Sequence, residues 1–456
     1  MDSSGGREEL YRRYLQESPR MLRAVEGLPP SDDPAAVVCR YVLAPALGAF
    51  TQWLLECSVN NGIRRLYFLA RDGYFFYRAA QLFCRTYRLP VECRYLSCSR
   101  YSLRIPLYHL DIEAALDYVC RGGLEVTSEK LLFRAGLTGE EVEQALLHLS
   151  LPYRRGDAIP YAALPNVRRQ LKNCDWFLSC MEKHSREALP PLIGYLKQEG
   201  LLESLSDAVV DSGWTGSMQK SLGDALAHMG RTRRLEGYYW GLYELPAAVE
   251  RDAYHSYYFS PEGNLKEKVH FNNCLFEAVY TAPHGMTLGY RDIGTAFVPL
   301  YGEISAARKV FVEQTGDCLM HYIRQLAKEE WRPADFAADR SVLYRLFKAF
   351  MGYPSRPEAD VFGSLPFSDD VLEGRERPIA APLSKEELRA NHVLPKLLAM
   401  TGIRRTPVRE SAWYEGSAVR NGADTGRHLR QHVLYQYLRH GRKILQARKH
   451  KGEVRS

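Results

Sequence analysis

The segment from Asp207 to Leu222, which reads DAVVDSGWTGSMQKSL, constrains the fold of this chain more than any other stretch. Residues 208–210 form an apolar run that predicts a short buried strand. A glycine-containing loop follows, and the spacing of Met218 and Leu222 then predicts a helix. A strand that turns directly into a helix is the building unit of α/β proteins, so we expect this fold class.

The loop of this segment is suited to binding a phosphate. Its residues are Ser212, Gly213, Trp214, Thr215, Gly216 and Ser217. Backbone N–H groups at the start of a helix are unpaired and lie at the positive end of the helix dipole, which favours an anion. Asp211 would repel a phosphate unless it binds sugar hydroxyls or a metal ion. A phosphorylated sugar satisfies both conditions, and a purely structural turn is the alternative.

Two earlier strands are predicted to end in polar residues. They are Arg65 to Ala70 (RLYFLA) and Glu92 to Ser97 (ECRYLS). The residues that follow them are Arg71, Asp72 and Gly73 after the first strand, and Ser99 and Arg100 after the second. Open α/β sheets bind ligands at the carboxyl ends of their strands, so we expect these residues at the same site as the loop.

The chain divides into regions of different pattern. An α/β core with N-terminal helices is predicted from residues 1–106 and 205–300, and it includes strands at Leu235 to Tyr243 and Tyr254 to Phe259. Residues 107–204 read as a helical insertion, and 301–456 as a C-terminal helical region. Within the latter, Gly352 to Leu383 is rich in Pro and Gly and is predicted to be a connection.

Composition limits the classes of partner. The chain has 456 residues and a net charge of +7, but from Thr425 to Ser456 nine basic residues face one acid, so the remainder is nearly neutral. A neutral body argues against nucleic-acid binding. Within the tail, Leu434, Tyr437, Leu438, Ile444 and Leu445 are predicted to form one helical stripe, opposite Arg442, Lys443, Arg448 and Lys449. That pattern suits an anionic membrane surface, and a solvated terminal helix is the alternative.

The location of the protein is inferred from two further features. The ten cysteines have no Cys-x-x-Cys or His/Cys zinc spacing, which predicts reduced thiols without a structural metal. The N-terminus lacks a signal pattern, and the apolar window from Tyr41 to Leu55 is interrupted by Pro45 and Gln52, so we expect it to be too short to span a bilayer. We therefore expect a cytoplasmic protein.

Three motifs stand in a fixed order: FLARDG (68–73), YLSCSRYSLRIP (95–106) and VVDSGWTGS (209–217). In this order they resemble type I phosphoribosyltransferases. Together with FEAVYTAPHG (276–285), they look more closely like the phosphoribosyltransferase module of bacterial polysaccharide assembly, which is often fused to a haloacid-dehalogenase-type phosphatase. The resemblance covers roughly residues 40–290, and it implies a type I phosphoribosyltransferase-like, mostly parallel sheet.

The resemblance implies a glycosyltransferase. It would move 5-phosphoribosyl from phosphoribosyl pyrophosphate to a sugar hydroxyl of a growing, lipid-linked glycan, with Mg²⁺ as cofactor and pyrophosphate as product. A separate or fused phosphatase would then remove the 5-phosphate. One departure concerns the loop: ordinary type I loops have two adjacent acids and one more residue before the threonine, whereas this chain has Asp211-Ser212 and Thr215.

Roles follow from the resemblance. Arg71 and Arg100 would stabilise the leaving pyrophosphate, with a helix-start cap and a surface salt bridge as the respective alternatives. Donor binding would involve Gly73, Ser99, Asp211, Ser212, Gly213, Trp214, Thr215, Gly216 and Ser217. Asp211 would bind the ribose hydroxyls, and Mg²⁺ would lie near Asp72 and Asp211.

Two carboxylates compete for the role of general base. Asp72 fits a magnesium contact through water, an acceptor base, or simply an N-cap for the following helix. Glu277 is the second candidate base, with a helix-surface acid as its alternative. His284 and Asn273 are candidate acceptor-binding residues, and a structural histidine is the alternative for His284.

Two other function classes remain. A haloacid-dehalogenase phosphatase needs a nucleophilic aspartate two residues before its second aspartate, and Ala70 stands in that position before Asp72. A non-catalytic phosphoribose- or nucleotide-binding module is the other alternative, and the shortened loop favours it.

Overall fold

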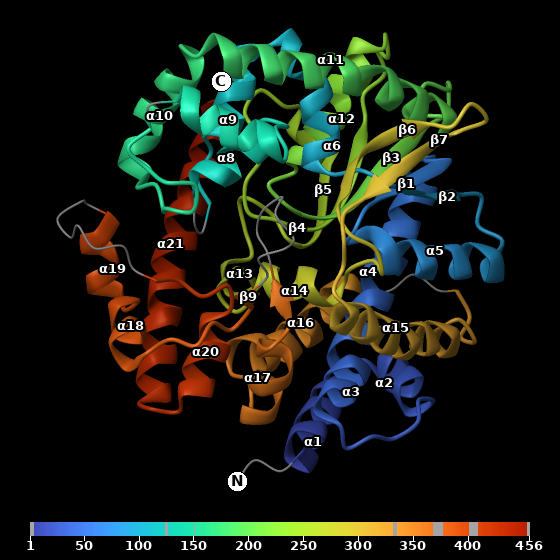
Figure 1. Cartoon of the computed structure of the whole chain (residues 1–456). Helices are drawn as coiled ribbons and strands as arrows, with labels where there is room; N and C mark the ends of the chain where they lie inside the picture. The colour runs from blue at the N-terminus through green and yellow to red at the C-terminus, as the bar shows by residue number, and fades with distance from the viewer. Residues whose placement is uncertain are drawn as a thin grey trace.

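A five-stranded, all-parallel sheet lies at the centre of the protein, as the computed structural model of the chain shows (Figure 1). The described residues are 4–123, 126–149, 151–331, 335–367, 377–400 and 409–453. The strand order is β2-β1-β3-β4-β5. The strands are β1 (Arg65–Leu69), β2 (Glu92–Leu96), β3 (Asp207–Trp214), β4 (Glu236–Leu242) and β5 (Tyr254–Phe259). The predicted α/β class with a parallel sheet is confirmed.

Helices cover both faces of the sheet, as the alternation of side chains along β1 shows. Leu66 and Phe68 belong to the larger core, together with side chains of α4 (Ala44–Asn60) and α5 (Gly73–Tyr87). Tyr67 and Leu69 point to the other face, where they pack with residues of α11 (Asp175–Gln198) and α12 (Ser217–His228). Successive residues of a strand face opposite sides, so an apolar run without polar residues fits a strand buried on both faces.

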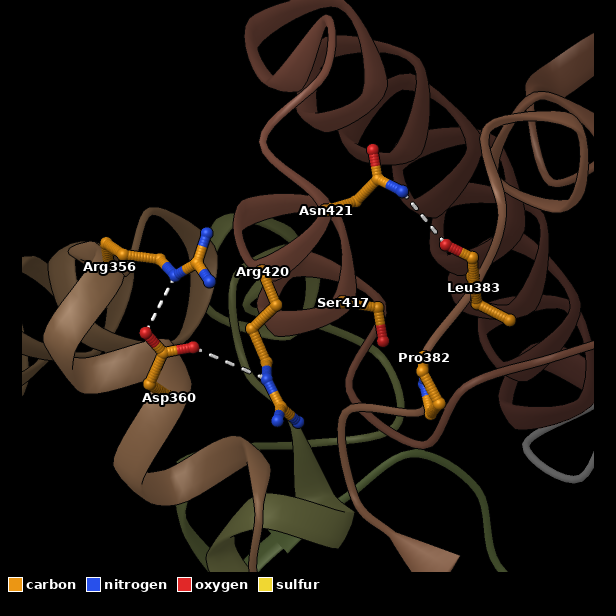
Figure 2. Close-up of a pocket in the computed structure, with 7 residues that line it drawn as sticks. All are labelled: Arg356, Asp360, Pro382, Leu383, Ser417, Arg420 and Asn421. Carbon is orange, nitrogen blue, oxygen red and sulfur yellow. Dashed lines mark hydrogen bonds and ion pairs between the residues drawn. The ribbon is translucent and has the colours of Figure 1, made fainter.

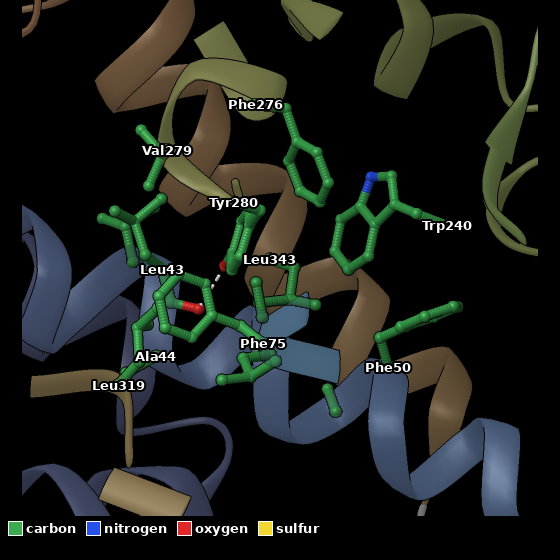
Figure 3. Close-up of a cluster of buried hydrophobic side chains, with 14 of the residues drawn as sticks. Leu43, Ala44, Phe50, Phe75, Trp240, Phe276, Val279, Tyr280, Leu319 and Leu343 are labelled. Atoms are coloured by element: carbon green, nitrogen blue, oxygen red, sulfur yellow. Dashed lines mark hydrogen bonds between the residues drawn. The ribbon is translucent and has the colours of Figure 1, made fainter. Parts of the chain in front are cut away.

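The larger core unites distant parts of the chain (Figure 3). Trp240 of β4 stacks on Phe276 of α14 (Asn273–Val279) with ring centroids 5.0 Å apart, and meets Phe50 of α4 edge-on at 5.8 Å. Leu319 of α15 (Ala306–Leu326) and Leu343 of α16 (Phe336–Phe347) belong to the same core. Helices that follow residue 301 therefore help to bury the sheet.

The N-terminal region is helical, as predicted. It contains α1 (Ser4–Leu15), α2 (Pro19–Glu26), α3 (Pro34–Val38) and the π-helix η1 (Cys39–Leu43), which continues into α4. The apolar window from Tyr41 to Leu55 belongs to a longer helical run, Pro34–Asn60, which is long and apolar enough to cross a membrane by length and composition alone, so the prediction of a short, interrupted segment is wrong. Pro45 does not interrupt the run because it lies in the first turn of α4, directly after the π-turn. Since 78 % of its apolar window is buried, the run is explained as a core helix.

The predicted insertion is helical and has a small core of its own. The helix α6 (Arg100–Arg104) and the start of η2 (Ile105–Leu110) precede residue 107 and lead into the insertion. Its further elements are α7 (Ile112–Val119), α8 (Ser128–Arg134), α9 (Glu140–His148), η3 (Tyr161–Ala163), α10 (Leu164–Lys172) and α11. Leu116, Leu131, Val142 and Phe177 are buried together there, apart from the core of the sheet.

The short helix η4 (Arg251–Ala253) precedes β5, and two short helices and a hairpin follow it. The helices are α13 (Leu265–Val269) and α14, and the hairpin consists of the antiparallel strands β6 (Thr287–Asp292) and β7 (Phe297–Tyr301). The sequence pattern did not reveal this hairpin, because its turn lacks an Asn-Gly or Asp-Gly step and its strands do not alternate cleanly.

The C-terminal region is helical beyond residue 304, as expected. Its elements are α15, α16, η5 (Lys348–Gly352), α17 (Arg356–Gly363), β8 (Pro366–Phe367), β9 (Arg377–Pro378), α18 (Lys385–Ala390), α19 (Val393–Met400), α20 (Tyr414–Asn421) and α21 (Thr425–Glu453). The prediction of a plain connection at Gly352 to Leu383 is wrong, because Ser355 and Glu358 form a capping box that starts α17. Residues 368–376 of that segment and 454–456 of the basic tail lie outside the described residues.

Candidate functional site

The strand order places the predicted site at a reversal of the chain. From β1 the chain proceeds to β2 on one side, and β3 then pairs with β1 on the other side. In sheets of this order, ligands bind at the carboxyl ends of the two strands at which the order reverses. The segments after β1 and β3 carry Arg71, Asp72 and Thr215, so the topology brings the predicted residues to one end of the sheet.

The loop after β3 is shorter than predicted. Ser212, Gly213 and Trp214 belong to β3, where Gly213 pairs with Gly241 and Trp214 with Leu242 of β4. The prediction that they lie in a loop is wrong, because Trp214 is buried among core aromatic rings and the pairing continues to it. The turn itself consists of Thr215 and Gly216.

Glycine is required where β3 ends. Gly213 has φ +111°, and a Cβ atom there would lie 2.5 Å from the carbonyl oxygen of Gly241. Gly216 has φ +61°, in the left-handed region, and a Cβ atom would meet the ring of Tyr254 at 2.7 Å. Only glycine tolerates both the conformation and the close approach. The strand can therefore turn into α12 within two residues.

The first turn of α12 offers donors for an anion. The helix begins at Ser217, and among the described residues no side chain caps its N-terminus. Thr215 and Ser217 are both half-exposed, so their hydroxyls are accessible beside the backbone N–H groups. The N–H of Thr215 itself donates to the carbonyl of Gly213 at 2.9 Å. This end of the helix has the features of a phosphate site.

Asp72 is tied to β3 and does not cap a helix. It occupies the N-cap position of α5, but its carboxylate makes no capping bond there and instead accepts a hydrogen bond from the Ser212 hydroxyl. Burial raises the pKa of Asp72, while Ser212 and then Arg71 counteract that rise. The N-cap interpretation of Asp72 is thus excluded, and a role at the site remains.

Glu277 is a half-buried acid that faces the same site. The indole N–H of Trp214 donates to Glu277 Oε1, so the two residues link α14 to the end of β3. Burial, and secondarily the charge of Asp72, raises the pKa of Glu277 to about 8. An ordinary acid on a helix surface would be exposed to water and would keep its usual pKa, so this alternative for Glu277 does not agree with its burial and its bond to Trp214.

Asp211 completes a group of three carboxyls. It is buried at the end of β3, and burial together with the charge of Asp72 raises its pKa to about 7. The charge of Asp72 raises the pKa of both Asp211 and Glu277, and like charges held close together favour a cation beside them. Among the described residues no three His, Cys, Asp or Glu side chains form a metal-binding group. The carboxylate oxygens of Asp72 and Asp211 fit Mg²⁺, which takes oxygen ligands and retains water or phosphate oxygens in its shell.

Positive charge comes from Arg71, Arg100 and Arg308, whose charges all act on Asp72. Arg100 is exposed, forms no ion pair with the acids of the described chain, and lowers the pKa of Asp72, Asp211 and Glu277. Arg100 therefore does not form the surface salt bridge that was the alternative to a role at the site. Arg308 of α15 is buried and its charge also acts on Asp72. No local motif points to Arg308, because it lies on a helix far along the chain from the other site residues.

An aromatic group borders the site. The Tyr95 hydroxyl donates to His284 Nε2 at 2.9 Å, and His284 Nδ1 donates to the Gly285 carbonyl at 2.8 Å. The ring of Tyr301 lies on His284 with centroids 4.1 Å apart, and the Tyr301 side chain is 40 % exposed. Burial lowers the pKa of His284, and the charge of Arg71 adds to this effect, so the imidazole is neutral. Both ring nitrogens of His284 already form hydrogen bonds, so only the faces of the neighbouring rings could contact a sugar.

The remaining predicted residues have structural partners. Gly73 starts α5 against β1, where a Cβ atom would lie 3.0 Å from the backbone carbon of Phe68. The Ser99 hydroxyl caps α6 and donates to the Thr287 carbonyl at 2.6 Å. Asn273 is half-exposed, one helical turn before Glu277 on α14, so the two lie on the same face.

A separate cavity of about 270 Å³ lies elsewhere (Figure 2). It is formed by Arg356, Asp360, Pro382, Leu383, Ser417, Arg420 and Asn421. Arg420 pairs with Asp360 at 3.5 Å, and the Asn421 amide donates to the Leu383 carbonyl at 3.0 Å. The cavity shares no residue with the end of the sheet and contains no group that the predicted chemistry uses.

Comparison with known proteins adds no relative: no family model matches the chain, and no curated protein matches it. The function must therefore be inferred from the residues at the carboxyl end of the sheet.

Proposed function

We propose that this protein is a phosphoribosyltransferase that acts as a glycosyltransferase. It would transfer 5-phosphoribosyl from phosphoribosyl pyrophosphate to a sugar hydroxyl of a bacterial polysaccharide, carried on a lipid at the cytoplasmic side of the membrane. The observation that carries the proposal is the convergence of an open helix N-terminus, three acids and three arginines at the β1/β3 reversal.

Each part of a phosphoribosyl donor has a matching group. The start of α12, with Thr215 and Ser217, would bind the 5-phosphate. Asp211 would bind the ribose hydroxyls. Arg71 and Arg100 would bind the pyrophosphate, because guanidinium groups stabilise the charge that develops on a phosphate leaving group. Asp72 and Asp211 would hold Mg²⁺, which supplies further charge neutralisation to the pyrophosphate when bound.

The proton balance of the transfer requires a base. The acceptor hydroxyl forms a bond to the anomeric carbon of the ribose, the bond to pyrophosphate breaks, and the hydroxyl proton must leave. Glu277 fits this role because its raised pKa lies near the working pH, where a carboxylate is both available and basic. Asp72, hydrogen-bonded to Ser212, would instead stay near the donor. The exposed ring of Tyr301, supported by His284, would pack against the acceptor sugar.

Donor binding tests the proposal first. Isothermal titration calorimetry with phosphoribosyl pyrophosphate should show binding that depends on Mg²⁺, and the ligand should raise the melting temperature. Thr215→Ala and Asp211→Asn should each weaken the affinity, by about tenfold for the loss of a hydrogen bond to a charged group. Unchanged affinity in both variants would refute the assignment of the β3–α12 turn.

Product analysis tests the transfer itself. Mass spectrometry of a synthetic glycan acceptor, incubated with donor, Mg²⁺ and pure protein, should show an added phosphoribosyl unit. Ala70 stands where a haloacid-dehalogenase phosphatase has its nucleophilic aspartate, and among the described residues no three His, Cys, Asp or Glu side chains form a metal-binding group for phosphate hydrolysis, which needs dedicated catalysis. A separate phosphatase would remove the phosphate afterwards. A ribosyl product without phosphate would favour the phosphatase alternative.

The second candidate function is a non-catalytic phosphoribose- or nucleotide-binding module. One observation favours it: the turn between β3 and α12 has only two residues, so fewer loop N–H groups face a phosphate. Such a module would bind the donor without consuming it. Pyrophosphate release measured with donor, Mg²⁺ and glycan acceptors distinguishes the two functions.

A further inference from the structure

The C-terminal helix α21 has a solvent face whose side chains are apolar and basic. Leu434, Leu438 and Leu445 are 50, 50 and 69 % exposed. At 100° per residue they fall within about 40° of one another around the helix axis. Buried side chains of the same helix, including His428 and His432, lie on the opposite side. These leucines are therefore not needed for packing α21 onto the protein.

The structure corrects the predicted stripe on this helix. Ile444 is buried and Tyr437 is half-buried, so neither joins the exposed leucines. Lys443 lies toward the protein, where its ammonium pairs with Glu244 at 2.9 Å. Arg448 donates to the Glu262 carbonyl at 2.9 Å. One side of α21 therefore packs against the protein, and only the residues on its other side form the exposed face.

Arginines flank the exposed leucines. Arg427 and Arg430 precede Leu434 on this side, and Arg442 lies between Leu438 and Leu445; all three arginines are exposed. No acid occurs between Thr425 and Gly452. Leucines at the centre of a helix face with arginines at its edges fit an interface at which apolar side chains enter lipid and guanidinium groups reach the headgroups.

A neighbouring helix adds apolar surface. α19 contacts α21, with Lys396 placed over the Tyr435 ring at 4.9 Å. On α19, Leu394 and Leu397 are 67 and 41 % exposed. Figure 1 shows α19 and α21 next to each other at one side of the molecule, away from the sheet. Glu410 pairs with Lys396 of α19, and Asp424, directly before α21, pairs with Lys385.

We propose that the exposed face of α21, defined by Leu434, Leu438, Leu445, Arg427, Arg430 and Arg442, docks the protein on an anionic lipid bilayer. The absence of acids on the helix is the reason for choosing an anionic surface. Docking of this kind needs no membrane-spanning segment, and it does not depend on the proposed transferase activity.

Vesicle co-sedimentation of the full chain tests this surface. The chain should pellet with phosphatidylcholine vesicles that contain about 30 % phosphatidylglycerol, and much less with phosphatidylcholine alone. Replacing Arg427, Arg430 and Arg442 with Gln should weaken partitioning at least tenfold, because each basic residue at such a surface is worth about fivefold. Replacing Leu434, Leu438 and Leu445 with Ser should also weaken it at least tenfold.

Matched controls lie on distant helices. Leu147→Ser removes a leucine that is 85 % exposed on α9, and Arg186→Gln removes an exposed arginine of α11. Both control variants should bind vesicles as the unmodified chain does. Equal partitioning of the α21 variants would overturn the proposal. So would light scattering that shows the chain to be a dimer that the leucine substitutions dissociate, because the face would then be covered by a second copy.

Discussion

The Ser212 hydroxyl donates a hydrogen bond to the carboxylate of Asp72, which joins the end of β3 to the start of α5. This bond crosses the point where the strand order reverses. It keeps a half-buried carboxylate at the carboxyl end of the sheet and lowers the pKa of Asp72 against the effect of burial.

The first prediction concerns this bond. Ser212→Ala should lower the free energy of unfolding by about 1–2 kcal/mol, because a charged acceptor in a partly dry site loses its donor. It should also weaken Mg²⁺-dependent donor binding, since Asp72 would become protonated more readily. Chemical denaturation and calorimetry measure the two effects. Ser364→Ala, at an exposed serine directly after α17, is the control and should change neither quantity.

The second prediction compares two glycines. Gly213→Ala should destabilise the protein by more than about 2 kcal/mol, because the residue has φ +111° and its new Cβ would lie 2.5 Å from the Gly241 carbonyl. Gly223→Ala, within α12, meets open space and should stabilise by about 0.4–1 kcal/mol. A similar melting temperature for both variants would show that the end of β3 is not constrained in this way.

The sequence predicted the sheet well and the site in part. All five strands of the sheet are predicted, and the central ones most clearly, because buried parallel strands contain continuous apolar runs such as residues 66–69 and 208–210. The extension of β3 through Ser212, Gly213 and Trp214 is not predicted, because the sequence pattern places Trp214 in a loop. Its burial depends on partners such as Phe271 and Phe276, which are distant in the sequence.

Long-range partners also explain what was missed at the site. Asp72 could be selected as an acid that follows a predicted strand, and Glu277 as an acid of the FEAVYTAPHG motif, but the surroundings of neither side chain could be predicted. Arg308 and Tyr301 reach the site from segments with no recognisable motif. Their contribution depends on how α15 and the β6/β7 hairpin pack, which no local pattern in the sequence encodes.

The third prediction separates a functional from a structural role for Trp214. Its indole N–H lowers the pKa of Glu277, so Trp214→Phe should raise that pKa further. The pH at which transfer is half-maximal should move upward by about one unit, the value of one lost hydrogen bond to a charged group. Trp240→Phe is the matched control, because the Trp240 indole nitrogen is buried without a partner in the described chain. An identical pH profile for both variants would argue against Glu277 as the base.

The last prediction uses Glu277 to separate stability from activity. The pKa of Glu277 is raised from 4.5 to about 8 in the folded protein, so the folded state holds its proton more tightly than the unfolded chain. Between those two pH values the unfolding free energy must fall as pH rises, because the unfolded chain has already released the proton. Glu277→Gln cannot ionise and can still accept the Trp214 hydrogen bond. Relative to the unmodified chain, the unfolding free energy of the variant should therefore increase by about 1–2 kcal/mol between pH 5 and pH 8, a value reduced by the partial exposure of the side chain.

The same variant should lose transfer activity by at least about a hundredfold while binding the donor, since a general base contributes that much. Denaturation at several pH values and pyrophosphate release measure the two effects. A variant that is no more stable at pH 8, or that still transfers at the normal rate, would show that Glu277 does not have the role proposed for it.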